Sequence, residues 1–206
     1  MRTDIVTLRY GNTYTVLIKG ASGSLLVDTD YAGTMQGFYR ALKANGIRLN
    51  QIGYMMATHY HPDHCGLIGQ LQAQGLQLLL ADSQAAAVHD PDYIFARERK
   101  EYTPVDPAKA TIISEIESRP FLKGLGIEGE IIRTVSHSTD SVALILDDGN
   151  CFVGDLEPPE YIEAYADNRL LAADWKLIMA RHPKTVHFAH APQRFSEKDF
   201  VVPGIS

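Results

Sequence analysis

Alternating apolar and polar positions in the first thirty residues predict three consecutive β-strands. Residues 4–10, 13–19 and 24–28 hold most of the β-branched and aromatic side chains of this region, while Gly11-Asn12 and residues 20–23 separate the runs. A glycine next to an asparagine between two such runs favours a turn. The pattern therefore predicts an antiparallel meander with tight turns.

Helical periodicity appears next. Met35, Phe38, Tyr39 and Leu42 follow the spacing i, i+3, i+4, i+7, and Asn45-Gly46 ends the pattern. Near the other end of the chain, Leu171, Trp175, Ile178 and Met179 form a second apolar stripe, which we interpret as ordinary core packing.

The rest of the chain alternates between the two kinds of pattern. Residues 66–74 fit a helix, and apolar runs predict strands at residues 52–57, 76–81, 131–135, 141–147, 151–154 and 185–189. Two rounds of strands followed by a helix suggest two related halves, although no repeat is visible in the sequence. The fold is therefore expected to be α+β, with layers of both kinds.

Residues 83–120 are the least regular part of the chain. We expect a helix over residues 108–117. One hypothesis is that the region forms a lid over a site, with Tyr93, Phe95 and Tyr102 as candidate contacts to a substrate. A solvated helical connector explains the same composition equally well.

Length and composition narrow the class of protein. The chain has 206 residues and a mass of 22.8 kDa, which suits one domain over residues 1–206. Its formal charge of −6 argues against nucleic acid as a partner. No apolar run is long enough to cross a membrane and the start resembles no export signal. Two cysteines, Cys65 and Cys151, form no disulfide framework, so we expect a cytoplasmic protein.

The strongest chemical signal is the stretch from residue 58 to residue 66, which contains His59, His61, Asp63 and His64. It follows an apolar run, and side chains at i and i+2 of extended chain share a face, so His59 and His61 point the same way. Pro62 then turns the backbone, so that the next two donors approach from another direction. A polar turn with incidental histidines is the alternative, but clustered imidazoles repel when protonated. We therefore predict a site for two metal ions.

Two ions need more donors than this stretch contains, because zinc takes three or four protein ligands per ion. His137, Asp155 and His190 each lie beside a predicted strand and complete the count. Taken alone, a histidine at a strand end is more often a hydrogen-bonded core residue. His187 competes with His190 but lies further inside its strand, and His89 and His182 are interpreted as surface residues.

The predicted ligands divide into two sets. His59, His61 and His137 would hold one ion, while Asp63, His64 and His190 would hold the second, with Asp155 bridging.

These motifs resemble those of the metallo-β-lactamase fold superfamily of hydrolases. The family's H-x-H-x-D-H hallmark matches His59-Tyr60-His61-Pro62-Asp63-His64, and its later histidine, bridging aspartate and last histidine match His137, Asp155 and His190. The match runs from about residue 4 to residue 192. The resemblance implies a four-layer αββα sandwich, with two mixed sheets, outer helices and the site at one edge. It also implies that Asp28 supports a ligand.

The sequence departs from the family pattern at three places. Asp30 and Ser136 stand where a glycine is usual, and Ala189-His190-Ala191 replaces a Gly-His-Gly pattern. The last departure makes His190 the least secure of the ligands.

The resemblance implies a metal-dependent hydrolase with two Zn²⁺ ions, with iron and manganese as alternatives. The two ions carry four positive charges, and the carboxylates of Asp63 and Asp155 cancel two of them. The remaining charge of about +2 favours a bridging hydroxide as the nucleophile. Asp63 is also the candidate catalytic proton acceptor, and Cys65 is interpreted as a packing residue. The expected partner is a small-molecule ester, thioester, lactone or amide, and a homo-oligomer is compatible with the sequence.

Other functions remain open at this point. A mononuclear iron oxygenase or oxidoreductase of the persulfide dioxygenase type would use a similar ligand set, as would a phosphodiesterase. A non-catalytic module that retains the fold is a third alternative, which the complete ligand count disfavours.

Overall fold

The strands of the computed structural model, which describes residues 3–164 and 168–195, form two mixed sheets. The first sheet contains, in spatial order, β1 (Asp4–Leu8), β2 (Thr15–Lys19), β3 (Ser24–Val27), β4 (Tyr54–Met56), β5 (Gln77–Ala81) and β6 (Thr111–Ile113). Strands β1 to β3 pair antiparallel, and β3 to β6 pair parallel. The meander predicted for the first three strands is confirmed.

The second sheet is assembled from the C-terminal half of the chain. Its spatial order is β11 (Arg194–Phe195), β10 (Thr185–Phe188), β9 (Asn150–Gly154), β8 (Val142–Leu146) and β7 (Gly129–Arg133). Only β9 and β10 pair parallel, so that their carboxyl ends reach the same edge of the sheet.

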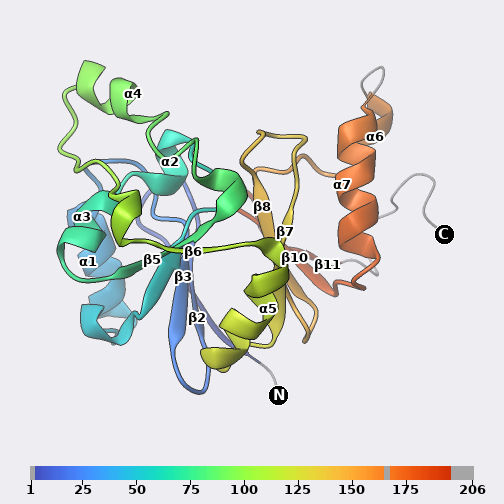
Figure 1. The fold of residues 1–206 in the computed structure, drawn as a ribbon, viewed down its shortest axis with the longest axis horizontal. Helices are drawn as coiled ribbons and strands as arrows, with labels where there is room; N and C mark the ends of the chain where they lie inside the picture. The colour runs from blue at the N-terminus through green and yellow to red at the C-terminus, as the bar shows by residue number, and fades with distance from the viewer. Residues whose placement is uncertain (1–2, 165–167, 196–206) are drawn as a thin grey trace.

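Helices cover the outer faces of both sheets, which gives four layers (Figure 1). Helices α1 (Met35–Ala44) and α3 (Ile68–Ala73) lie outside the first sheet, and α7 (Arg169–Met179) lies outside the second. The remaining helical segments are η1 (Leu49–Gln51), α2 (Pro62–Cys65), η2 (Asp82–Gln84), α4 (Asp92–Arg97), η3 (Pro107–Lys109), α5 (Glu115–Gly124) and α6 (Tyr161–Ala164).

Three buried clusters hold the layers together. Leu26 and Phe38 belong to the cluster between the first sheet and its helices, while Trp175 belongs to the one between the second sheet and α7. Residues such as Ile18 and Leu144 fill the space between the sheets. Because strand side chains alternate between faces, each sheet feeds two clusters, and the predicted αββα sandwich is confirmed.

Two local expectations are wrong. Residues 108–117 do not form one helix: the β-branched run Thr111–Ile113 is strand β6, and α5 begins only at Glu115. A capping box between Ser114 and Glu117 fixes that start. The first turn of the meander is also not tight, since residues 9–14 form a loop between β1 and β2.

Phe95 anchors the region from residue 83 to residue 120 to the rest of the fold. Phe95 is 2% exposed and contacts the rings of Tyr31 and Tyr102, with centroid distances of 5.4 and 4.9 Å. Phe95 therefore anchors α4 and is not accessible to a substrate. Tyr93, another candidate contact, is 67% exposed. Among the described helices, none is both long enough and apolar enough to cross a bilayer.

Gly69 allows the same region to approach α3, which leads to a stability prediction. A Cβ at this position would lie 1.9 Å from the Thr103 carbonyl oxygen, a backbone atom. Gly69→Ala should therefore lower the free energy of unfolding by about 1–3 kcal/mol, the usual cost of overpacking. Urea denaturation followed by circular dichroism measures the change.

Gly124→Ala is the matched control, because nothing lies within 4 Å of a Cβ added there, at the last residue of α5. It should leave stability unchanged or raise it by up to about 1 kcal/mol, since alanine favours helix more than glycine does. Equal destabilisation by both substitutions would contradict the packing argument.

Candidate metal centre

The structure brings all seven predicted ligands to one edge of the sandwich. His59 and His61 follow β4, Asp155 follows β9, and His190 follows β10 shortly after its end. The others are His137, in the loop between β7 and β8, and the pair Asp63 and His64 in the short helix α2. Both sheets direct strand ends to this edge, which is where sites in layered α and β folds usually form.

The first three imidazoles converge on one point. His137 Nε2 lies 3.1 Å from His59 Nε2 and 3.1 Å from His61 Nδ1. Two nitrogens bound to one tetrahedral zinc at about 2.0–2.1 Å would be separated by about 3.3 Å. The observed spacing therefore matches three ligands of a single ion.

The second group is centred on His190 Nε2, which lies 3.2 Å from Asp63 Oδ2 and 3.2 Å from Asp155 Oδ1. His64 Nε2 lies 3.3 Å from the same Asp155 oxygen. The other oxygen, Asp155 Oδ2, faces the first group, at 4.0 Å from His59 Nε2 and 3.8 Å from His137 Nε2. Asp155 therefore lies between the two groups, with one oxygen toward each.

Two buried atoms in this centre lack a hydrogen-bond partner, namely His64 Nε2 and Asp155 Oδ1. Such atoms are rare in folded proteins unless a bound group satisfies them. Ligand atoms of three overlapping trios lie within 4.8 Å of one another: His59, His61 and His137; His59, His64 and Asp155; and Asp63, His64 and His190. The donor set, imidazole nitrogens and carboxylate oxygens, fits zinc or iron.

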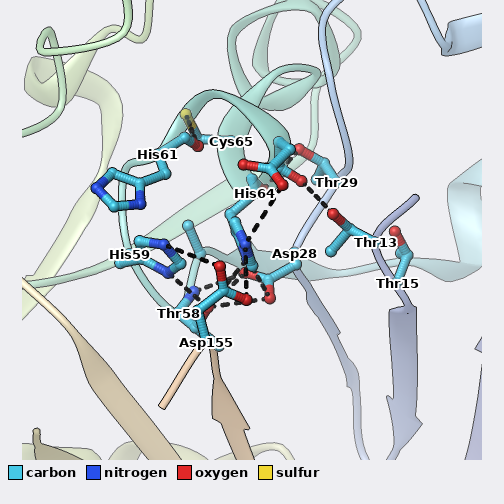
Figure 2. A network of polar contacts seen from close by, with 12 residues as sticks. Thr13, Thr15, Asp28, Thr29, Thr58, His59, His61, His64, Cys65 and Asp155 are labelled. Carbon is cyan, nitrogen blue, oxygen red and sulfur yellow. Dashed lines mark hydrogen bonds and ion pairs between the residues drawn. The ribbon is translucent and has the colours of Figure 1, made fainter. Parts of the chain in front are cut away.

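Asp28 orients His64, as the resemblance implied. Asp28 Oδ2 lies 3.0 Å from His64 Nδ1, and the Thr58 amide donates to Asp28 Oδ1 at 2.7 Å (Figure 2). A proton on Nδ1 leaves the Nε2 lone pair available to an ion held between His64 and Asp155, which is the arrangement metal-ligating histidines need. Asp28 adopts the left-handed conformation, with φ of 59°, to reach this position.

Asp140 connects the two loops that carry the first group. Its Oδ2 accepts from the Tyr60 amide at 2.7 Å, between His59 and His61, and its Oδ1 accepts from Ser138 Oγ at 2.7 Å. Ser138 follows His137, so this one carboxylate aligns the histidine loops of both sheets.

Burial and neighbouring imidazoles lower the pKa of His59, and burial lowers the pKa of His137. Neutral imidazole is the form that binds metal, so these two side chains are ready to ligate at neutral pH.

The second group behaves differently. Burial acts to lower the pKa of His64, but Asp28 and Asp155 outweigh it and raise the value to about 10. The close carboxylates of Asp155 and Asp63 raise the pKa of His190 to about 11, and the contact with His190 lowers the pKa of Asp63. A cation bound here would therefore displace protons from the imidazoles.

Sequence reasoning missed several residues that shape this centre. Thr58, Asp140 and Gln84 are buried, and the Gln84 side chain donates to the carbonyl oxygens of Thr58 and Asp140 at 3.3 and 3.1 Å. Nothing local in the sequence marks these contacts. Asp174 could have been found, because it interrupts the apolar stripe of α7; its Oδ2 accepts from the Ser136 amide at 2.7 Å.

The other candidate histidines lie outside the cluster. His187 Nε2 pairs with Asn150 Oδ1 at 2.9 Å, and its ring stacks on Phe152 with a centroid distance of 4.5 Å. His89 and His182 are exposed. Cys65 is buried in the core cluster of the first sheet, with its thiol directed at the His61 carbonyl oxygen.

A pocket of about 370 Å³ opens beside the two groups. His137, Asp155 and His190 line it together with mostly apolar side chains, which include Leu156, Pro158, Tyr161 and Phe188.

A four-layer αββα sandwich with histidines and aspartates at the ends of strands from both sheets defines a class of metal-binding proteins. The family model for the metallo-β-lactamase superfamily matches residues 8–190. The chain belongs to this superfamily.

Solved structures agree on the fold. The BLEG-1 B3 metallo-β-lactamase is 16% identical, with 98% of this chain and 100% of that chain covered and a TM-score of 0.71. The family protein TTHA1429 from Thermus thermophilus is 16% identical, with coverages of 92% and 74% and a TM-score of 0.70. TTHA1623, solved in a di-iron-bound form, is 20% identical, with coverages of 95% and 98% and a TM-score of 0.68. No curated protein matches the chain significantly.

His187 gives a prediction about stability and pH. Burial lowers its pKa to about 4 from 6.5, so between these values the unfolded chain binds a proton that the folded chain does not. Stability from His187 is therefore complete above about pH 6.5 and falls as the pH drops toward 4. His187→Gln should flatten the pH dependence of unfolding in this window, measured by urea denaturation at pH 7.5, 6 and 5.

His89→Gln is the control, because this exposed histidine should leave the pH dependence as in the wild type. An unchanged slope for His187→Gln would show that His187 does not contribute to it.

Proposed function

We propose that the protein is a dinuclear metal-dependent hydrolase, with two zinc ions, that acts on a small ester, thioester, lactone or amide. The observation that carries the proposal is the position of Asp155, whose two oxygens face two separate groups of ligands. Metal binding by the fold is expected from the superfamily, whereas the number and kind of ions and the substrate are the proposal.

The geometry supports two ligand sets. His59, His61 and His137 would hold one ion, and Asp63, His64 and His190 would hold the other, with Asp155 shared. Two divalent ions with two carboxylates leave a net charge of about +2, which attracts an electron-rich carbonyl. When bound, the ions would supply Lewis acidity and activate water at neutral pH.

Asp63 is suited to a second role as proton acceptor. Its side chain is 30% exposed at the edge of the centre, whereas His64 beside it is fully buried. A partly exposed carboxylate can exchange a proton with solvent after each turnover more readily than a fully buried ligand can.

The adjoining pocket supports a small-molecule substrate. Its volume of about 370 Å³ is within the range of small-molecule sites, and side chains such as Leu156 and Phe188 offer apolar contacts to an acyl or alkoxy group. Glu157 adds a carboxylate to the lining.

An iron-dependent oxidoreductase is the second candidate. TTHA1623 is described in a di-iron-bound form, and another structural neighbour is described as a peroxy diiron species of a chemotaxis sensor. Ligand sets of histidine and carboxylate accept either metal, so the ligands alone do not decide between the two functions. Elemental analysis of protein purified without added metal distinguishes them.

Loss of one ligand from each group tests the proposal. His61→Ala and His190→Ala should each reduce bound zinc from two ions per chain toward one and lower hydrolysis by about 100-fold or more, since both ions act on the same carbonyl. Bound metal is measured by elemental analysis, and activity on a panel of ester, lactone, thioester and phosphodiester substrates.

His89→Ala is the matched control, because His89 is an exposed histidine outside the cluster. It should keep two ions and full activity. Full occupancy and undiminished turnover in both ligand variants would refute the proposal, while iron in place of zinc together with no hydrolysis would favour the second candidate.

A further inference from the structure

Asp30 connects the helix that carries two ligands with a loop of the first sheet. It is 2% exposed and adopts the left-handed conformation, with φ of 59°. Its backbone oxygen accepts from the Gly66 amide at 2.9 Å, just after α2. Its side chain accepts from the Tyr31 amide at 2.6 Å through Oδ1 and from the Thr13 amide at 3.4 Å through Oδ2.

The loop of residues 9–14 contacts two ligands of the second group. Thr13 Oγ1 donates to the Asp63 carbonyl oxygen at 2.7 Å. His190 Nδ1 lies 3.2 Å from the Asn12 carbonyl oxygen, and the Tyr14 amide donates to the Ala189 carbonyl oxygen at 2.7 Å. The Asn12 carbonyl oxygen and side-chain amide both lie against Nδ1, so they orient the ring with Nε2 toward Asp63 and Asp155.

Gly11 allows the Asp30 carboxylate to reach this loop. A Cβ at Gly11 would lie 1.6 Å from Asp30 Oδ2, so any side chain there would displace the carboxylate. Within the part of the chain that the structure describes, no hydrogen bond joins residues 9–14 to His59, His61 or His137. Among the described residues, the hydrogen bonds of the loop therefore reach only the second of the two ligand groups.

We infer that Asp30, through the loop of residues 9–14, is a positioning residue for the second ion and not for the first. The inference rests on the proposed two-ion centre. Asp30 holds Asn12 and Thr13 in place, and these fix the ring of His190 and the backbone of Asp63. Without the carboxylate the loop loses its inner hydrogen-bond acceptor, and the two ligands lose their common support.

Stepwise zinc binding tests this inference. Metal-free protein is titrated with Zn²⁺ in competition with a chromophoric chelator, which gives separate affinities for the two ions, and Co²⁺ spectra report the coordination of each. Asp30→Gly should lower the affinity for the second ion by about 10-fold or more and change the affinity for the first by less than twofold. Glycine tolerates the φ of 59°, so the backbone can keep its conformation.

Asp30→Asn provides the conservative variant. Asparagine also tolerates a positive φ but offers only one acceptor oxygen, so it should lose less affinity for the second ion than Asp30→Gly does. If the glycine variant does not fold, the asparagine variant still tests whether Asp30 supports binding of the second ion.

Asp148→Gly is the matched control. Asp148 accepts from the amides of Thr3 and Asn150 at a turn beside the other end of β9, away from Asp155. This substitution removes a similar turn-holding carboxylate and should leave both zinc affinities unchanged.

Gly11→Ala supplies an independent route to the same result. The added methyl group should displace the Asp30 carboxylate and lower the affinity for the second ion. In protein that already carries Asp30→Gly, the same substitution should have little further effect on this affinity. This loss of additivity is expected only if both substitutions act through the same contact.

Three results would overturn the inference: unchanged affinity for the second ion in both Asp30 variants, equal weakening of both ions, or full additivity of the Gly11 and Asp30 substitutions. None of these results contradicts the proposed function as long as the wild-type protein binds two ions. Wild-type protein that takes up only one ion would overturn the two-ion proposal and this inference together.

Discussion

The contact between the end of β9 and the loop after β4 is the constraint on which the centre depends. Gly154 ends β9 with φ of 60°, and a Cβ there would lie 2.5 Å from Thr58 Oγ1. This close approach of the two sheets brings Asp155 against His59 and His64. A larger residue at position 154 would separate the sheets at this edge, and the carboxylate would no longer lie between the two ligand groups.

Buried polar residues from both halves of the chain stabilise this junction. The Val142 amide donates to the Thr58 carbonyl oxygen at 2.8 Å, which ties the two sheets directly. Asp28, Asp140 and Gln84 satisfy further buried donors and acceptors around the same residue. A network of this kind, in a region of low dielectric, holds its members more rigidly than separate surface contacts would. These contacts fix the loops that carry the candidate ligands of both sheets.

Two aspartates in left-handed conformation, Asp28 and Asp30, frame the second ligand group. A positive φ costs energy for residues other than glycine, although aspartate bears it better than most. Each carboxylate makes hydrogen bonds that offset this cost, to His64 and Thr58 in one case and to the loop of residues 9–14 in the other. Such strain near a centre is typical of functional sites, where surrounding contacts fix an otherwise unfavourable backbone.

The sequence by itself determined the layers and most of the chemistry. Period-two apolar runs predicted the strands, the spacing of Leu171, Trp175 and Ile178 predicted α7, and the cluster from His59 to His64 indicated a metal site, because these signals are local. The sequence and its family resemblance also proposed His137, Asp155 and His190 as the distant members of that cluster. The tertiary structure supplied the contacts themselves, with His190 beside Asp63 and His187 beside Asn150. It also gave Thr58, Asp140 and the loop of residues 9–14 their roles, since those roles depend on contacts between segments that lie far apart in the chain.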